Sequence, residues 1–156
     1  MFKRFIFIVL CSFMVSNVWA AKAPEFTLKT QAGDTVSLSD YQGKPLIIHF
    51  WATWCPYCKK LQPGLNALHQ KYKSQDLEIL PISLWEDEGA TPQKALYSRG
   101  FNFKTLINGD AIHKKFGVVG TPTTFFVSRT GEIIYKTSDS NPDSPNLEKA
   151  VKAILK

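Results

Sequence analysis

The chain has 156 residues, of which 44% are hydrophobic and 21% are charged, and its formal net charge is +6 at pH 7. This length and apolar content suffice for one domain with a single buried core, so the fold needs no scaffold of disulfides. The lysines are scattered among acidic and apolar residues, which indicates a solvated surface and argues against a nucleic-acid-binding protein.

The N-terminus has the pattern of a secretory signal peptide. Two basic residues precede an apolar run over residues 5–15, and the small-residue exit Val18-Trp19-Ala20 follows. We therefore predict a signal peptide at residues 1–20 and one domain at residues 21–156, exported to the periplasm or another extracytoplasmic space. An uncleaved membrane anchor is the weaker alternative, because polar residues interrupt the run before it reaches the roughly 20 apolar residues of a span.

Removal of the signal peptide changes both the charge and the cysteine count. It takes away Cys11, two basic residues and no acidic residue, which leaves 17 basic and 13 acidic residues and a net charge of +4. Only Cys55 and Cys58 remain, and export places them in a compartment where disulfides can persist.

The first half of the domain predicts a hairpin, a buried strand and a long helix. Residues 24–28 and 35–38 are expected to be extended, with a turn at Gly33-Asp34. Residues 46–51 form an apolar run of strand length, and apolar residues at helical spacing follow from Leu61 to Tyr72. The two cysteines therefore lie where a strand ends and a helix begins.

The second half continues the alternation of strands and helices. In chain order we predict a buried strand at residues 77–83, a helix from Thr91 to Gly100, a short strand within 101–107, a helix from Asp110 to Gly117, a hairpin of residues 123–127 and 132–136, and a closing helix that follows Ser144 and ends near Leu155. This order predicts an α/β fold in which a mixed central sheet has helices on both faces.

The cysteine pair could bind a metal or exchange disulfides. Zinc needs two further ligands at close spacing, and His49, His69 and His113 are far apart in the sequence. We therefore predict no metal site. Two thiolates alone can hold copper(I), so copper(I) handling stays open as an alternative.

The redox interpretation has a direct mechanism. At a helix start the first amides lack intrahelical partners and the helix dipole is positive, so a thiolate on Cys55 is stabilised. Pro56 suits the first helical position, and Cys58 lies one turn further along the same face. We expect Cys55 to be the exposed nucleophile and Cys58 the resolving thiol. Farther along, the Thr121–Pro122 bond is expected to be cis, because this proline stands between a glycine-rich loop and a strand.

Three spaced motifs resemble the thioredoxin superfamily. They are Phe50-Trp51-Ala52-Thr53-Trp54-Cys55-Pro56-Tyr57-Cys58-Lys59, then Pro63, and then Gly120-Thr121-Pro122-Thr123. The resemblance runs from about Ala23 to the C-terminus. Within the superfamily, the exported TlpA/ResA/DsbE-type proteins are similar at residues 23–28, at residues 36–44 and in the additional helix and strand between residues 83 and 110.

The resemblance implies a thioredoxin-like fold with an N-terminal extended segment or hairpin and an extra helix-strand insert. It implies that Cys55 and Cys58 are catalytic and that Thr121, beside Pro122, offers backbone hydrogen bonds to client proteins. The other residues expected to contact clients are Trp54, Pro56 and Tyr57. No cofactor is expected besides the disulfide itself. The expected partners are client proteins with disulfides or thiols and a membrane electron donor of the thiol-disulfide type.

Two positions depart from the family. Thioredoxin has a buried acid where this chain has His49, which is either a core histidine with a satisfied hydrogen bond or a proton-transfer group for Cys58. Cytochrome c maturation members have a glutamate where this chain has Leu61, so that specific role is less expected. The nearest resemblance is to reductases, and we predict a thiol:disulfide reductase. A peroxiredoxin-like thiol peroxidase and a disulfide-forming oxidase are the alternatives.

Overall fold

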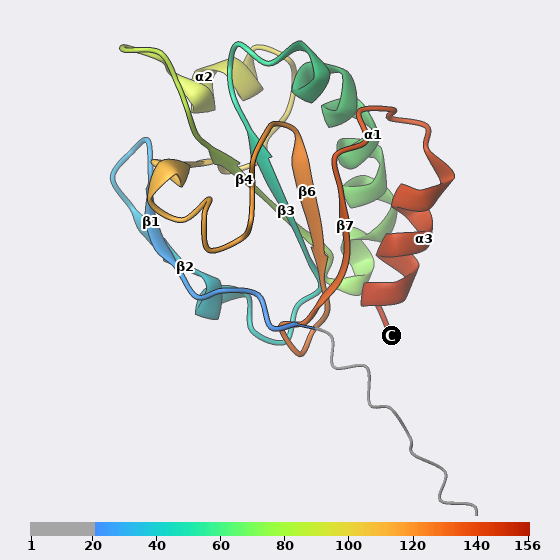
Figure 1. Cartoon of the computed structure of the whole chain (residues 1–156). Coiled ribbons are helices and arrows are strands. Elements are labelled where there is room, and N and C mark those ends of the chain that lie inside the picture. The colour runs from blue at the N-terminus through green and yellow to red at the C-terminus, as the bar shows by residue number, and fades with distance from the viewer. Residues whose placement is uncertain (1–20) are drawn as a thin grey trace, which may run out of the picture.

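The computed structural model describes residues 21–156, in which seven strands form one sheet and the helices pack against it (Figure 1). The strand order across the sheet is β2-β1-β5-β4-β3-β6-β7. The predicted signal peptide, residues 1–20, lies outside the described residues.

The sheet is mixed, as the sequence predicts. Strands β3 and β4 are parallel, as are β4 and β5, and the other neighbouring pairs are antiparallel. The strands are β1 (Thr27–Thr30), β2 (Thr35–Ser37), β3 (Leu46–Trp51), β4 (Glu78–Ser83), β5 (Leu106–Ile107), β6 (Thr123–Val127) and β7 (Ile133–Thr137). The α-helices are α1 (Pro56–Tyr72), α2 (Pro92–Tyr97) and α3 (Pro145–Ile154), and the 3-10 helices are η1 (Leu38–Tyr41), η2 (Lys73–Gln75) and η3 (Gly109–Ala111).

Strand β3 lies between β4 and β6, and all six of its residues are buried. Its side chains alternate between the two faces of the sheet. Ile47 and Trp51 belong to the core cluster on the face of α1 and α3, whereas Ile48 and Phe50 belong to the cluster on the opposite face. A strand buried on both faces reads as a continuous apolar run, which explains why the sequence predicts β3 correctly.

The two faces of the sheet are covered by different elements. Helices α1 and α3 lie side by side on one face (Figure 1), and Leu96 of α2 joins the same core cluster. The opposite face packs against Phe26 before β1, Leu38 of η1 and Ile112 after η3. The three α-helices therefore cover one face, and 3-10 helices with their flanking segments cover the other.

The N-terminal hairpin and the helix-strand insert meet at one side of the sheet. Strand β1 pairs with β2 on one edge and with β5 on the other, both antiparallel. Strand β5 follows α2 in the chain and pairs in parallel with β4. Both additions that the family resemblance implies are therefore present, and together they extend the sheet beyond β4.

The helix predicted from Asp110 to Gly117 is wrong, because only the 3-10 helix η3 and a run of turns occur there. Asn108 and Gly117 both have positive φ, at 63° and 62°. The carboxylate of Asp110, the residue predicted to cap this helix, instead accepts hydrogen bonds from the Trp85 amide at 3.3 and 3.4 Å. The strand expected within residues 101–107 is likewise limited to the two residues of β5.

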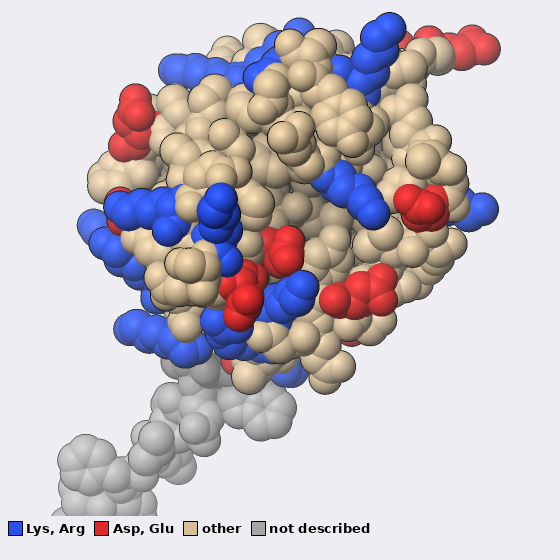
Figure 2. Space-filling view, turned by 180° about the vertical axis from the view of Figure 1, so that it is seen from behind, with Lys and Arg blue, Asp and Glu red and all other residues tan. Residues whose placement is uncertain are grey.

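The surface carries charges of both signs. On the face seen in Figure 2, basic side chains gather toward one side and acidic side chains lie among them. Lys44 forms an ion pair with Glu78, and Lys71 forms one with Glu148. Within residues 21–156, no helix has both the length and the apolar character that a membrane crossing requires.

Candidate active site

Cys55 and Cys58 form a disulfide at the junction between β3 and α1. Cys55 is the N-cap residue of α1, and Pro56 is its first helical residue. A proline suits this position because the N–H that it lacks would have no intrahelical partner. The Cα atoms of the two cysteines are 5.3 Å apart. The end of the strand and the first turn of the helix therefore hold the two sulfur atoms together.

The sulfur of Cys55 lies where the helix favours negative charge. The amide nitrogen of Cys58 donates a hydrogen bond to Cys55 Sγ at 3.1 Å, at the positive end of the α1 dipole. The expectation that Cys55 is exposed is wrong for the disulfide form, because Cys55 is only 2% exposed and Cys58 is 0% exposed. The first turn of α1 and the carbonyl group of Thr121 pack around the Cys55 sulfur.

The loop that precedes β6 reaches the same disulfide. The carbonyl oxygen of Thr121 lies 3.6 Å from Cys55 Sγ. The Thr121–Pro122 peptide bond is cis, and the hydroxyl of Thr123 donates to the Gly120 carbonyl oxygen at 2.7 Å. Two of the three motifs that carry the family resemblance are therefore in contact, although they are far apart in the sequence.

Apolar side chains around the disulfide are open to solvent. Trp54 is 48% exposed, Tyr57 is 62% exposed and Val119 is 95% exposed. The indole Nε1 of Trp54 donates to the carbonyl oxygen of Trp85 at 2.7 Å, which fixes this ring despite its exposure. Sequence pattern points to Trp54 and Tyr57 but not to Val119. A loop valine has no signal of its own until the fold brings its loop to the cysteines.

His49 is buried inside the sheet, with 1% of its surface exposed. Its Nδ1 lies 3.0 Å from the hydroxyl oxygen of Thr124, the residue opposite it on β6. Its Nε2 has no hydrogen-bond partner among the described residues. Burial lowers the pKa of His49 to about 3, so the ring is neutral at pH 7. The hydrogen bond expected of a core histidine is thus present at one ring nitrogen only.

Sequence pattern alone does not single out Glu86, yet its carboxylate holds the chain just before Cys55. It accepts hydrogen bonds from the Thr53 amide at 2.9 and 3.1 Å, from the Thr53 hydroxyl, and from the Ser83 hydroxyl at 2.9 Å. Ser83 ends β4 and is the register partner of Trp51 at the end of β3. The sequence signal that could have found Glu86 is an acidic residue soon after β4, because β4 runs parallel to β3 and β3 leads to the cysteines.

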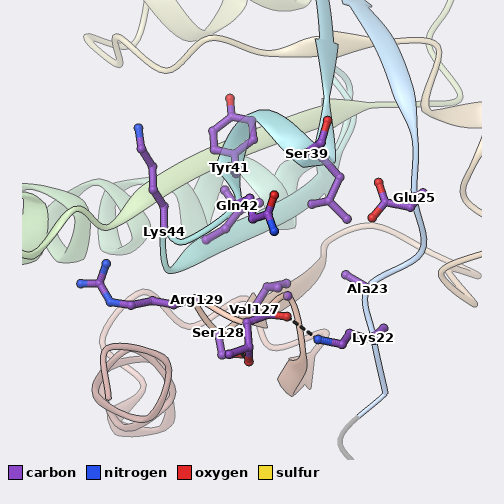
Figure 3. Close-up of a pocket in the computed structure, with 14 residues that line it drawn as sticks. Lys22, Ala23, Glu25, Ser39, Tyr41, Gln42, Lys44, Val127, Ser128 and Arg129 are labelled. Carbon is purple, nitrogen blue, oxygen red and sulfur yellow. Dashed lines mark hydrogen bonds between the residues drawn. The ribbon is translucent and has the colours of Figure 1, made fainter.

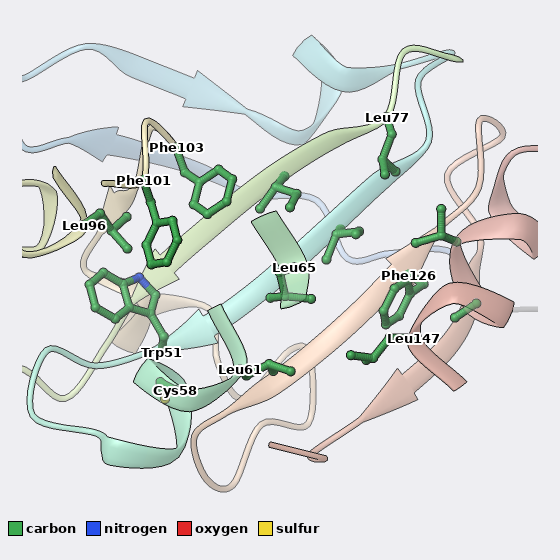
Figure 4. Packing of buried hydrophobic residues seen from close by; sticks show 14 of the residues in the cluster. Trp51, Cys58, Leu61, Leu65, Leu77, Leu96, Phe101, Phe103, Phe126 and Leu147 are labelled. Carbon is green, nitrogen blue, oxygen red and sulfur yellow. The ribbon is translucent and has the colours of Figure 1, made fainter. Parts of the chain in front are cut away.

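Apolar side chains surround the inner side of the disulfide. Trp51, Cys58 and Leu61 belong to one buried cluster on the α1 face of the sheet (Figure 4). Phe101 and Phe103 stack on each other in the same cluster, with ring centroids 5.7 Å apart. Leu61 is 0% exposed and therefore acts as a core residue at the position where cytochrome c maturation members have a glutamate.

One surface cavity of the protein is lined by neither cysteine. This cavity, of about 370 Å³, is lined by Tyr41, Lys44, Leu46 and Arg129 among others (Figure 3). It lies at the opposite end of β3, because Leu46 begins this strand and the cysteines follow its last residue. Within residues 21–156, no three His, Cys, Asp or Glu side chains are grouped so as to hold a metal ion.

The geometry contains the two parts that thiol–disulfide exchange needs. One sulfur, at a helix start, accepts an amide hydrogen bond that would stabilise a thiolate. The second sulfur is buried one turn further on, within bonding distance of the first, where it can resolve a mixed disulfide.

Curated proteins with similar sequences are described as thiol-disulfide oxidoreductases. Residues 20–136 match the AhpC/TSA family. Thiol-disulfide oxidoreductase ResA of Bacillus thuringiensis subsp. konkukian is 32% identical over 114 residues, which make up 72% of this chain and 65% of that protein. ResA of Geobacillus kaustophilus is 35% identical over 112 residues, which make up 71% of this chain and 64% of that protein. The match therefore spans slightly less than two thirds of the length of these curated relatives.

Solved structures are similar over most of the chain. A Chlorobium tepidum protein described as a thiol:disulfide interchange protein DsbE is 28% identical with a TM-score of 0.78, and the match covers 88% of this chain and 97% of that chain. A secreted disulfide oxidoreductase of Mycobacterium tuberculosis, homologous to E. coli DsbE, is 26% identical with a TM-score of 0.69, covering 82% and 95%. These similarities confirm the thioredoxin-like fold that the sequence motifs imply.

Proposed function

The chain belongs to the AhpC/TSA family, and we propose that it is a thiol:disulfide oxidoreductase that reduces disulfides of client proteins outside the cytoplasm. The observation that carries this proposal is the hydrogen bond from the Cys58 amide to Cys55 Sγ at the start of α1. Once the disulfide is reduced, this amide and the helix dipole stabilise a thiolate on Cys55. The names of the ResA relatives support the same activity.

In the proposed reaction the dithiol form of the protein acts on a client disulfide. The Cys55 thiolate attacks one client sulfur, the client S–S bond breaks, and the other client sulfur leaves as a thiolate that takes up a proton. The Cys58 thiol then loses its proton and attacks the Cys55 sulfur, which releases the first client sulfur and forms the Cys55–Cys58 disulfide. The client gains two electrons and two protons, and the protein loses them.

Client binding is proposed for the surface around the disulfide. Trp54, Pro56 and Tyr57 are exposed there and offer apolar contact to a client segment. The carbonyl group of Thr121 is proposed to accept a hydrogen bond from the client backbone, and the buried Pro122 supports the loop that presents it.

His49 is the proposed acceptor of the Cys58 proton in the second step. Its ring is neutral at pH 7, and its Nε2 has no hydrogen-bond partner among the described residues. This role requires the tautomer in which Nδ1–H donates to Thr124, because Nε2 then has a free lone pair. Burial disfavours a lasting imidazolium. The proton therefore passes from the ring to the client thiolate that the second step releases.

The proposed direction of electron flow is reduction of the client. In this proposal a membrane electron donor of the thiol-disulfide type returns the protein to its dithiol form after each turnover. Support for export comes from the signal-peptide pattern of residues 1–20 and from the similar Mycobacterium tuberculosis protein, which is described as secreted.

The proposal is tested by the reduction of a protein disulfide, with insulin as the client and glutathione as the source of electrons. We expect turnover by the wild-type protein and none by Cys55→Ser, because the nucleophile is missing. Cys58→Ser should accumulate as a mixed disulfide with the client, because the resolving thiol is missing. Wild-type turnover by Cys55→Ser would refute the proposal.

Two alternative activities would use the same cysteines. Hydrogen peroxide consumption measures thiol peroxidase activity, and we expect the wild-type protein to consume no more peroxide than Cys55→Ser does. Competition with a copper(I) chelator measures copper handling, and we expect binding no tighter than micromolar. A peroxidase rate that depends on Cys55 would favour the peroxidase alternative.

A further inference from the structure

Two opposite charges lie near the end of β3, the strand that leads to the disulfide. Arg99, in the turn after α2, places its guanidinium over the Trp51 ring, with Cζ 5.5 Å from the ring centroid. The carboxylate of Glu86 is held at the end of β3 by hydrogen bonds from Thr53 and Ser83. Trp51 itself lies in the same buried cluster as Cys58 (Figure 4).

Arg99 also contacts the helix that carries the disulfide. Its Nη1 donates a hydrogen bond to Gln62 Oε1 at 2.6 Å, and Gln62 is buried. Gln62 follows Cys58 by four residues, so the two lie on the same face of α1. Burial lowers the pKa of Arg99 and Glu86 opposes this shift, but an arginine starts from so high a pKa that it keeps its charge. A fixed positive charge therefore contacts a residue that lies one helical turn from Cys58.

Glu86 places a negative charge on the chain just before Cys55. Its main partner, Thr53, precedes Cys55 by two residues and donates from both its amide and its hydroxyl. Its second partner, Ser83, is fixed by the parallel pairing of β4 with β3. Glu86 is only partly exposed, so solvent screens its field less than that of a fully exposed acid.

The remaining charged or titratable groups near the disulfide are exposed or neutral. His49, from β3, is neutral at pH 7. The loop of residues 117–122 contains no charged residue. The exposed groups are Tyr57, Lys59 and Lys60 on α1, Asp87 and Glu88 after Glu86, and Lys136, which donates to the Gly117 carbonyl oxygen. Glu86 and Arg99 are thus the charges whose positions are fixed by hydrogen bonds and partial burial.

We propose that Glu86 and Arg99 are positioning residues that set the redox potential of the Cys55–Cys58 disulfide through opposite electrostatic effects on the Cys55 thiolate. This inference rests on the proposed disulfide exchange. A negative charge near the sulfur disfavours the thiolate, which favours the disulfide and makes the protein more reducing. A positive charge has the opposite effect.

The test compares the wild-type protein with Glu86→Gln and Arg99→Gln. For each, the pKa of Cys55 is measured from the ultraviolet absorbance of the thiolate, and the equilibrium with glutathione is measured above that pKa. In this equilibrium two glutathione thiols reduce one Cys55–Cys58 disulfide and become one glutathione disulfide. We expect Glu86→Gln to lower the Cys55 pKa and to shift the equilibrium about tenfold toward the dithiol, which corresponds to about 30 mV. Arg99→Gln should shift both quantities the other way.

Thr53→Val is the matched control, because it removes one hydrogen bond to Glu86 and leaves both charges in place. We expect it to change the equilibrium constant by less than about twofold. On a logarithmic scale this is under a third of the tenfold shift expected from removing a charge. If Glu86→Gln does not fold, the sign of the Arg99→Gln shift alone decides whether the inference stands.

Shifts of the same sign in both charge variants would overturn the inference, because they indicate a structural effect alone. No shift in either variant would also overturn it, because the two charges then have no effect on the Cys55 thiolate. A wild-type disulfide that does not exchange with glutathione at all would instead refute the proposed function. The two failures are therefore distinguishable in one set of measurements.

Discussion

The amide nitrogen of Cys58 donates a hydrogen bond to Cys55 Sγ at 3.1 Å, while the carbonyl oxygen of Thr121 lies 3.6 Å from the same sulfur. In the reduced protein the amide would favour a thiolate on Cys55, and the carbonyl group would favour a thiol that donates to it. This pair of contacts gives Cys55 an environment suited to both protonation states that exchange requires.

The first prediction concerns the order in which the cysteines react. Because of the amide and the helix dipole, the pKa of Cys55 should lie below the value of about 8.5 for a free cysteine. Cys58 is buried and should react more slowly. Alkylation of the dithiol form with iodoacetamide at increasing pH, followed by mass spectrometry, should therefore label Cys55 first. Faster labelling of Cys58 would show that the two roles are reversed.

The second prediction concerns the buried imidazole of His49. Its pKa in the folded protein, about 3, is below its ordinary value of 6.5, so the unfolded chain takes up a proton where the folded protein does not. The corresponding stability is fully present above pH 6.5 and is lost as the pH falls toward 3. Between pH 7.5 and pH 5 we expect a loss of about 2 kcal/mol in the free energy of unfolding, measured with urea.

His49→Asn should remove that loss, whereas His113→Asn, in the turn after η3, should retain it. The His49 variant also tests the proposed proton transfer, because the pH dependence of disulfide exchange should change when the imidazole is absent. A profile identical to that of the wild-type protein would contradict the proton-transfer role and leave His49 as a core residue.

The third prediction concerns the contact between α1 and α3. Glu148 on α3 accepts hydrogen bonds from Lys71 at 2.8 Å and from the Tyr72 hydroxyl at 2.6 Å, and Lys152 lies 3.2 Å away. The Lys71 hydrogen bond, then those of Tyr72 and Lys152, lower the pKa of Glu148 from 4.5 to about 2. The resulting stability is present above pH 4.5 and is lost as the pH falls toward 2.

Glu148→Gln should therefore flatten the dependence of Tm on pH in this acid range. Glu88→Gln changes an exposed acid in the loop after β4 and serves as the control, with the wild-type dependence expected. Equal acid dependence in the Glu148 variant and the wild-type protein would show that these hydrogen bonds do not join the helices in solution.

The fourth prediction concerns Gly64, which lies inside α1. A Cβ at this position would meet the carbonyl oxygen of Pro142 and approach its Cα to 2.7 Å. Helix propensity alone predicts that Gly64→Ala stabilises the protein by up to about 1 kcal/mol. Because the Pro142 backbone cannot give way easily, we expect destabilisation by about 1–3 kcal/mol instead. Urea unfolding distinguishes the two signs, with Asn66→Ala on the same helix as the control, for which no loss is expected.

The elements that the sequence predicts well are those with local patterns. Strand β3 is a continuous apolar run because it is buried on both faces, and α1 has apolar residues at helical spacing after the cysteines. The helix expected at residues 110–117 does not form, because Asp110, its predicted cap, accepts hydrogen bonds from the distant Trp85 amide instead. Sequence periodicity does not reveal such tertiary hydrogen bonds.

The candidate site shows a similar division. Cys55, Cys58 and the cis Thr121–Pro122 bond can be found from motifs, because each motif is short and contiguous. Glu86 cannot be found this way, since its function depends on the register that places Ser83 beside Trp51. The burial of Cys55 is also a tertiary effect, because part of its cover comes from a loop 66 residues away in the sequence.

The redox potential of the Cys55–Cys58 disulfide, measured at equilibrium with glutathione, tests the central claim most directly. A protein that reduces client disulfides should have a potential in the range of thioredoxin, about −270 mV, and well below that of glutaredoxins and stronger oxidants. A potential near about −120 mV, typical of a strong protein oxidant, would contradict the assignment of this protein as a reductase.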